Sequence, residues 1–253
     1  MNKAQFWNLI DDVNQATERQ EKDAILMATQ QKLLELSARE IVDFHNYLTL
    51  YMDLADTSNL VAAAVAINGG ISDDGFTDFR AWLVSLGKDT YRNALKKADS
   101  LAEVEIGSEP YGTLFEFYGY IASYAYEVKM MQEQKGMEQF CGNEYFSLTP
   151  KGVELVQQML EYHCAYENPF ANSKDPFVQS LYQTLRSKIS AADIYDAAKD
   201  YPLSEEYKKE IRDGLEFEAP IPCPHRWSPA DVQKAVPELY SKYCEHGYTL
   251  GGM

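Results

Sequence analysis

The chain has few cysteines and histidines, and it has none of the linear motifs that identify common enzyme classes. It contains four cysteines and four histidines in 253 residues. It has no phosphate loop, no dinucleotide-binding glycine pattern, no serine-hydrolase elbow and no zinc-protease helix motif. Enzymes without such motifs exist, so their absence weakens the case for catalysis without excluding it. The sequence therefore predicts no catalytic residue and no cofactor.

Long apolar runs and a secretion signal are also missing. The opening residues MNKAQFWNLIDD turn acidic at once, unlike a signal peptide. The longest apolar run, residues 60–67, is far too short to span a bilayer. We therefore expect a cytoplasmic protein with no membrane partner, in which the cysteines are reduced thiols.

Basic residues are scarce relative to acidic ones. The 23 lysines and arginines stand against 39 aspartates and glutamates, which gives a formal net charge of −16 at pH 7. A broad negative field opposes the binding of nucleic-acid phosphates and of anionic membranes. We therefore expect no nucleic-acid partner, and a basic protein as the partner if there is one. Neutralisation of a basic toxin or nuclease would suit this charge, although solubility alone also explains it.

Helical periodicity is present along the whole chain. Apolar side chains recur at spacings of three and four, as in Ile41, Phe44 and Leu48, and this spacing builds one face of a helix. The sequence predicts an all-α, multi-helix globular bundle. We expect a helical domain over residues 1–135 and a helical C-terminal region over residues 136–253, packed on the first.

Local signals mark where several helices begin and end. Ser37 and Glu40 form a capping box, which starts a helix at this point. A long helix is expected from Thr113 to Glu133. The proline-rich residues 215–229 predict an extended connector, followed by a last helix that is interrupted near Pro237.

The most signal-rich stretch is NGGISDDGFTDFRAWLVSLGKDTY, residues 68–91. Gly69 and Gly70 are expected to end one helix, and Ser72 to cap the next. Asp73 and Asp74 then fall in the first turn, where carboxylates favour the positive end of the helix dipole. Trp82 flanks the apolar face of this helix and is expected to be buried.

The same stretch supplies the candidate binding residues. Asp74 and Asp78 are four residues apart and share a helical face with Asp73 nearby, so the three carboxylates are candidates for a Mg²⁺ or Ca²⁺ site. Arg80 is a candidate for binding a carboxylate or phosphate. The alternative is structural: the aspartates stabilise a helix start and Arg80 pairs with one of them.

Tyrosine is abundant, with 18 residues. Tyrosine packs an apolar ring while keeping a polar tip, which suits half-buried faces and interfaces. Tyr118 and its neighbours on the helix Thr113–Glu133 are candidates for a contact surface. The leading hypothesis is a non-catalytic binding or interaction module, and the alternative is a divalent-metal enzyme that uses Asp73, Asp74 and Asp78.

Two further patterns have weak support. Cys223, His225, Cys244 and His246 are suitable zinc ligands, but only one residue separates the members of each pair, which is unusual for structural zinc sites. We expect no bound metal. His45 is more typical of a hydrogen-bonded, half-buried residue than of a base or ligand.

Residues 148–155 resemble the end of the wing in winged-helix DNA-binding proteins. No basic recognition helix precedes them, and the net charge opposes DNA binding. Residues 137–149 are compatible with either a short strand or irregular structure. We therefore do not favour a DNA-binding function.

The pattern GG-x-SDD-x-F-x-x-FRAWL-x-x-x-G-x-x-x-Y carries one family resemblance. Together with Phe6-Trp7, the stretch 33–40, Phe44, Ala62-Ala63-Ala64 and Asp99-Ser100-Leu101, it resembles the bacterial domain-of-unknown-function family numbered 4240 over residues 1–128. The resemblance implies a helical domain. It implies no activity and no functional residue.

Overall fold

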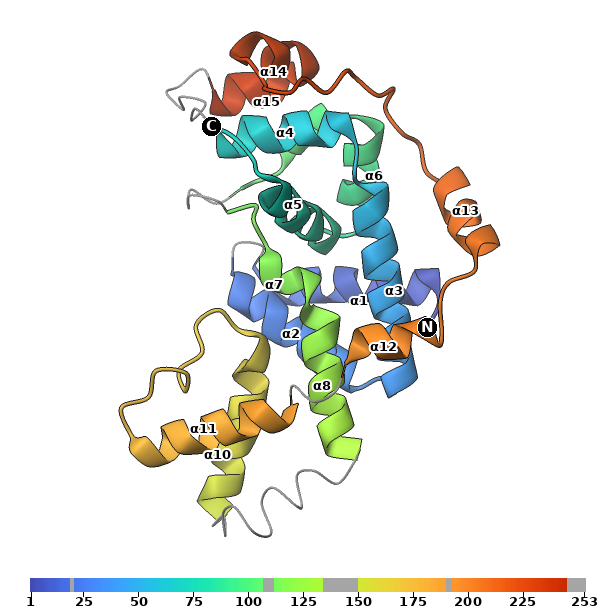
Figure 1. The fold of residues 1–253 in the computed structure, drawn as a ribbon. Helices are drawn as coiled ribbons and strands as arrows, with labels where there is room; N and C mark the ends of the chain where they lie inside the picture. Colours follow the sequence, from blue (N-terminus) through green and yellow to red (C-terminus); the bar gives the residue numbers. More distant parts are fainter. Residues whose placement is uncertain (19–20, 107–111, 134–149, 190–192, 245–253) are drawn as a thin grey trace. The chain divides into compact units, whose positions relative to one another are not determined.

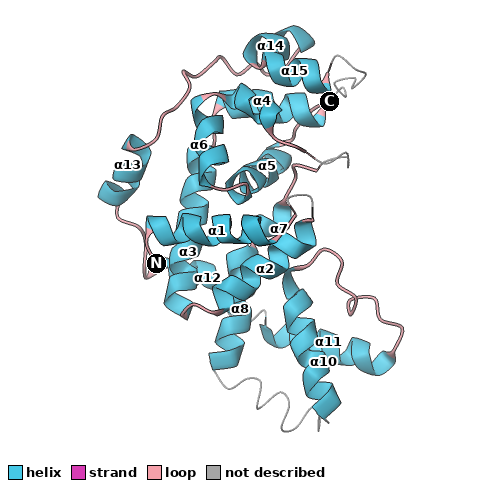
Figure 2. Ribbon diagram, turned by 180° about the vertical axis from the view of Figure 1, so that it is seen from behind, coloured by secondary structure: helices cyan, strands magenta, loops and turns pink. Residues whose placement is uncertain are grey.

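The computed structural model describes residues 1–18, 21–106, 112–133, 150–189 and 193–244. All regular structure in these ranges is helical, and they contain no strand (Figures 1 and 2). The predicted all-α class is confirmed. Residues 137–149, for which the sequence left strand or irregular structure open, lie outside the described ranges, as do Gly136 and His246.

The chain forms two compact units, each assembled from several segments. Unit 1 consists of Met1–Leu9, Gln15–Asn46 and Tyr120–Pro202, and unit 2 of Ile10–Asn14, Tyr47–Gly119 and Leu203–Met253. The sequence-based division between residues 135 and 136 follows position along the chain. The packing instead combines N-terminal and C-terminal segments within each unit.

Unit 1 contains helices from both halves of the sequence. They are α2 (Lys22–Leu34), α8 (Ile121–Glu133), α10 (Pro150–Glu161), η2 (Tyr162–Cys164), α11 (Pro176–Ile189) and α12 (Ile194–Lys199). Its core joins α8, α10 and α11 through buried side chains such as Val128, Val156 and Leu181. Helices α1 (Lys3–Ala16) and α3 (Ala38–Leu54) supply residues to both units.

Unit 2 surrounds the apolar helix α4. Its helices are α4 (Ser58–Asn68), α5 (Asp73–Ser85), α6 (Lys88–Lys96), η1 (Ala98–Glu103), α7 (Glu116–Gly119), α13 (Glu205–Asp213), α14 (Pro229–Ala235) and α15 (Pro237–Tyr243). Helices α14 and α15 pack against α4 (Figure 1). Ala62, Ala63 and Ala64 are fully buried, because small side chains let neighbouring helices approach closely.

Length and composition identify no single described helix as a membrane span. The bent pair α3 and α4 meets that test only when the two helices are taken together. Within unit 2, α4 is buried along most of its length.

Several predicted helix ends are confirmed. The Ser37 backbone N–H donates to Glu40 Oε2 over 3.1 Å, and the Glu40 N–H donates to Ser37 Oγ over 3.3 Å, as a capping box requires. Gly69 ends α4 with φ of 72°, a conformation that glycine adopts without steric cost. Ser72 Oγ accepts the Gly75 N–H over 3.1 Å at the start of α5.

The predicted continuous helix from Thr113 to Glu133 is wrong at its N-terminal end. The structure has the short α7 and then α8, with Tyr120 between them. Before α7, Thr113 Oγ1 donates to Asn68 Oδ1 over 2.8 Å, and the Phe115 N–H donates to the Asp78 carbonyl over 3.2 Å. These contacts with other parts of unit 2 hold residues 113–115 outside helical geometry.

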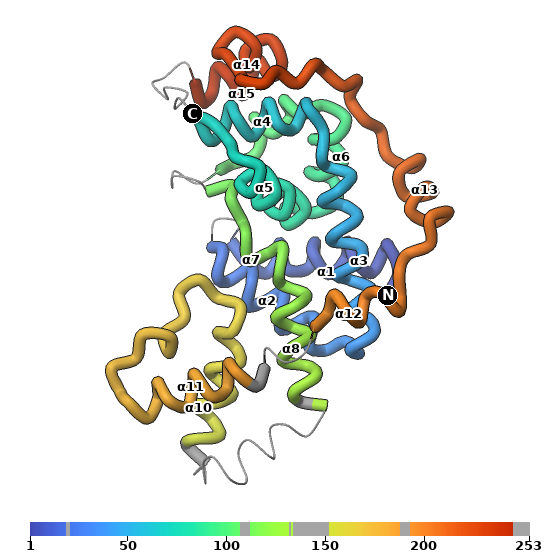
Figure 3. Tube along the Cα trace, in the orientation of Figure 1, coloured from blue at the N-terminus to red at the C-terminus, as the bar shows by residue number. Residues whose placement is uncertain are grey.

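The connector between α13 and α14 is extended, as its prolines predict (Figure 3). It is attached to the N-terminal part of unit 2 by hydrogen bonds: the Ala98 N–H donates to Glu218 Oε2 over 2.9 Å, and Asn59 Nδ2 donates to the Ala219 carbonyl over 3.2 Å. These contacts fix the path of the chain that leads into residues 223–229.

The carboxylate of Asp99 anchors α15. Asp99 is 2% exposed and accepts the N–H groups of Glu238 over 3.1 Å and of Leu239 over 2.9 Å. These donors lie in the first turn of α15, where the helix itself offers them no acceptor. The predicted interruption at Pro237 is confirmed, since α14 ends at Ala235 and α15 begins at Pro237.

Candidate functional site

The predicted binding residues of α5 do not form one site. Asp73 and Asp74 are exposed in the first turn, as predicted, next to the Ser72 cap. Asp78 is half-buried, and its backbone carbonyl accepts the Phe115 N–H. Within the described ranges, no three or more His, Cys, Asp or Glu side chains are grouped so that they could hold a metal ion. The three aspartates therefore do not have the geometry that the divalent-metal hypothesis requires.

Arg80 is occupied by contacts within unit 2. Its guanidinium donates to the Met52 carbonyl over 3.2 Å and to Thr77 Oγ1 over 3.1 Å, and it lies 3.7 Å from Asp56 Oδ2. Only 14% of its side chain is exposed. Arg80 therefore pairs with a carboxylate, although with Asp56 and not with an aspartate of its own helix.

Tyr118 lies in the core. It is 1% exposed, and its ring centroid is 5.2 Å from that of Phe115. Its side chain does not reach the surface, whereas Tyr120, two residues later, is 44% exposed.

An open pocket of about 1210 Å³ lies in unit 2, beside the start of α5. The N-terminal part of the chain contributes Val61, Val65, the turn 69–72, Asp73 and Phe76 to its lining. The positions of these residues follow from the glycine end of α4 and the serine cap of α5. Of the predicted binding residues, Asp73 alone lines the pocket.

The C-terminal part of the chain supplies the rest of the lining: residues 223–229, Tyr240 of α15 and Cys244. The segment 223–229 reads CPHRWSP and is extended because its prolines disfavour helix. It ends where Ser228 caps α14, with the Asp231 N–H donating to Ser228 Oγ over 3.2 Å. Three large polar or aromatic side chains, His225, Arg226 and Trp227, therefore line the pocket in succession.

The pocket contains two unpaired basic side chains. His225 and Arg226 are exposed, and neither makes a hydrogen bond or ion pair with any other residue in the described part of the chain. Trp227 is half-buried, whereas Trp7 and Trp82 are 3% and 6% exposed. The burial predicted for Trp82 is confirmed.

Three of the four residues considered as zinc ligands line the pocket, but among the described residues they are not grouped so that they could hold a metal ion. These three are Cys223, His225 and Cys244, while His246 lies outside the described residues. The Cys244 thiol donates to the Ala66 carbonyl over 3.5 Å, and burial raises the pKa of this thiol. A raised pKa disfavours the thiolate that zinc requires.

Unit 1 carries a group of tyrosines that we call the tyrosine patch: Tyr120, Tyr126, Tyr195 and Tyr201. Tyr120, Tyr195 and Tyr201 are 44%, 49% and 46% exposed. Burial raises the pKa of Tyr195, a hydrogen bond with Ser123 opposes this shift, and Tyr120 and Asp193 add to it. Burial also raises the pKa of Tyr126, to which Glu133 and Tyr201 add. Tyr195 is therefore close to Tyr120, and Tyr126 to Tyr201, in the region where α8 contacts α12.

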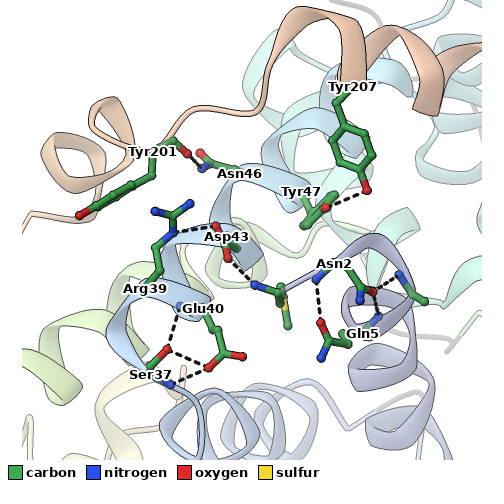
Figure 4. A network of polar contacts seen from close by, with 12 residues as sticks. Asn2, Gln5, Ser37, Arg39, Glu40, Asp43, Asn46, Tyr47, Tyr201 and Tyr207 are labelled. Atoms are coloured by element: carbon green, nitrogen blue, oxygen red, sulfur yellow. Dashed lines mark hydrogen bonds and ion pairs between the residues drawn. The ribbon is translucent and has the colours of Figure 1, made fainter.

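The tyrosine patch already holds one cation. The Arg39 guanidinium lies 3.8 Å from the centre of the Tyr201 ring, and its Nε donates to Asp43 Oδ1 over 3.0 Å (Figure 4). Asn46 Nδ2 donates to the Tyr201 carbonyl over 2.9 Å and fixes the backbone there. In unit 2, a separate pair joins Tyr47 and Tyr207 through their hydroxyls, 3.1 Å apart.

A family model described as a protein of unknown function (DUF4240) matches residues 1–128. The chain belongs to this family. The DUF4240 segment supplies α4, the start of α5 and Asp99, while residues 223–229, Tyr240 and Cys244 lie beyond the match. None of the curated proteins and none of the solved structures matches the chain.

Sequence reasoning missed Arg226, Trp227, Tyr195 and Tyr201. The sequence predicts a connector over residues 215–229 and gives no role to Arg226 or Trp227 within it. A signal was available, because a histidine, an arginine and a tryptophan stand together among four prolines, where a plain linker has small polar residues. Nothing local distinguishes Tyr195 and Tyr201 from the other tyrosines.

Proposed function

We propose that this DUF4240 protein is a non-catalytic binding module, and that its acidic, tyrosine-rich surface takes a basic protein as partner. The observation that carries the proposal is the tyrosine patch of unit 1, with three tyrosines each more than 40% exposed. Tyrosine is enriched at the centres of protein interfaces, because its rigid ring buries much area at low entropic cost.

Charge supports a basic partner. Asp193, Asp196 and Asp200 are exposed on or beside α12, within a chain of net charge −16. The position of Arg39 over Tyr201 is an internal example of a guanidinium on a ring of this patch. An arginine or lysine of a partner would be attracted both to the ring faces, through cation–π interactions, and to the carboxylates, through opposite charge.

The test is affinity capture with the purified protein at low and at high salt. The Tyr195→Ala/Tyr201→Ala variant removes two patch rings, and Phe177→Ala serves as the matched control, since Phe177 is 49% exposed on α11 outside the patch. We expect the wild type and the control to retain basic proteins at low salt. Loss of two contact rings should lower the affinity for a purified partner by about tenfold or more.

Retention of the same partners by the double tyrosine variant would contradict the proposal, as would partners that are acidic or insensitive to salt. Gel-shift assays with duplex DNA and structured RNA at about 50 mM salt test the nucleic-acid alternative. Micromolar or tighter binding of either nucleic acid would contradict the basic-protein proposal and favour a nucleic acid as the partner.

A further inference from the structure

We propose that the pocket of unit 2 binds an organic anion that carries an aromatic ring. This site is separate from the tyrosine patch of unit 1 and does not depend on it. Typical small-molecule pockets occupy roughly 300–1,000 Å³ and combine apolar walls with a few polar groups. The pocket, at about 1210 Å³, has room for a ring and a charged group together.

Arg226 points to the anionic group. Acidic residues outnumber basic ones by 39 to 23, and two arginines are paired with carboxylates, Arg39 with Asp43 and Arg80 with Asp56. Arg226 has no such partner in the described part of the chain, although it lines a pocket. A guanidinium binds carboxylates and phosphates through two parallel hydrogen bonds, and His225 beside it can donate a further one.

The aromatic part of the ligand follows from Trp227, Phe76 and Tyr240, which line the same pocket. Trp227 is the one tryptophan of the chain that is not buried. A half-buried indole ring at the wall of a pocket offers a face on which a flat ligand stacks. The combination of an unpaired guanidinium and a half-buried indole in the lining of one pocket is what selects this ligand class.

Asp73 sets the orientation of the ligand. Its carboxylate also lines the pocket and repels an anion, so the charged end of the ligand belongs at Arg226 and its hydrogen-bond donors belong at Asp73. Replacing Asp73 with asparagine should therefore strengthen the binding of an anion or leave it unchanged. Replacing Arg226 should weaken it.

The experiment is isothermal titration calorimetry of the full chain with three probes. Adenosine 5′-monophosphate and 2-naphthoate present a ring with a phosphate or a carboxylate, and adenosine is the neutral reference. We expect at least one of the two anions to bind. If adenosine 5′-monophosphate is the anion that binds, adenosine should bind at least tenfold more weakly than the monophosphate does. Trp227 supplies a second readout, because ligand contact should alter its fluorescence.

The Arg226→Gln substitution is expected to lower the affinity for the anionic probe by about tenfold or more, the range for losing a charge-assisted hydrogen-bond pair. Arg212→Gln is the matched control, since Arg212 is exposed on α13 in unit 2 and does not line the pocket. Circular dichroism of both variants confirms that each is folded. Absence of binding by both anions at millimolar concentration overturns the proposal. Equal affinity of the wild type and the Arg226→Gln variant for the anionic probe also overturns it. The proposal likewise fails if adenosine and the monophosphate bind equally well and 2-naphthoate does not bind.

Discussion

The two units use their large amphipathic side chains differently. Among the described residues, unit 2 has one exposed large aromatic side chain, Phe217. Unit 1 has five: Tyr120, Tyr166, Phe177, Tyr195 and Tyr201. Both units bury aromatic residues, such as Phe6 and Phe44 in unit 1 and Phe79 in unit 2, but unit 2 also sets Trp227 into the wall of a pocket. Exposed rings on helices suit a broad protein surface, and rings in a pocket suit a small flat ligand.

The arginines beside the tyrosine patch and the pocket also differ. In unit 1, Arg39 is held by Asp43 and the Tyr201 ring, so the proposed basic partner would meet ring faces and carboxylates at this patch. In unit 2, Arg226 is without a partner among the described residues and stands in a pocket. If both proposals hold, this acidic chain binds cationic groups on one unit and an anion in a pocket of the other.

The largest expected effect separates core aromatics of unit 2 from exposed aromatics of unit 1. Trp82 is 6% exposed, and its ring centroid lies 5.2 Å from that of Phe79. Trp82→Ala should lower the free energy of unfolding by about 3–5 kcal/mol, the usual cost of deleting a large core aromatic. Phe177→Ala, at a 49% exposed position in unit 1, should cost under about 1 kcal/mol. Urea unfolding measures both, and equal losses would contradict the burial of Trp82 in the core of unit 2.

A second, smaller effect tests how unit 2 holds the helix that carries Tyr240. Asp99→Ala leaves two N–H groups at the start of α15 without their acceptor, and should cost about 2–3 kcal/mol, the range for hydrogen bonds to a charged group. Glu103→Gln, at an exposed position at the end of η1, is the matched control. Amide hydrogen exchange should accelerate in α15 for the alanine variant alone. Unchanged exchange in α15 would show that other contacts hold the helix.

The sequence predicted the features that depend on neighbouring residues. The Ser37 capping box, the Ser72 cap, the glycine end of α4 and the burial of Trp82 all follow from spacings of a few residues along one helix. The pocket could not be predicted in this way. Asp99 and Leu239 are 140 residues apart, and no local pattern shows that a buried aspartate in one segment caps a helix in the other.

The contrast between Tyr118 and Tyr120 has a related cause. Periodicity assigned both to one helix and could not show which face is covered. The helix in fact starts only at Glu116, stops after Gly119 and restarts at Ile121. Residues two apart point to different sides of a helix, and here Tyr118 is buried while Tyr120 is exposed.

The smallest expected effect is a pH dependence of stability that arises in unit 1. His45 is 7% exposed, and its ring meets that of Tyr195 edge-on, with centroids 5.0 Å apart. Burial lowers the pKa of His45, and Asp193 opposes this shift only in part. The unfolded chain, in which histidine titrates near pH 6.5, therefore binds this proton more readily than the folded chain does. The stability that neutral His45 provides is complete above about pH 6.5 and is lost as the pH falls through the lowered folded pKa.

The His45→Gln variant tests this contribution because it removes the titrating group and keeps a polar side chain. Urea unfolding between about pH 8 and about pH 5 should give a free energy of unfolding that falls more steeply for the wild type than for the variant. The two curves should run parallel above about pH 7, where neither state of the wild type is protonated at this position. Parallel curves over the whole range would mean that His45 is reached by water and protons in the folded protein. In that case the packing of Tyr195 against His45, and with it the position of this ring in the tyrosine patch, would have to be revised.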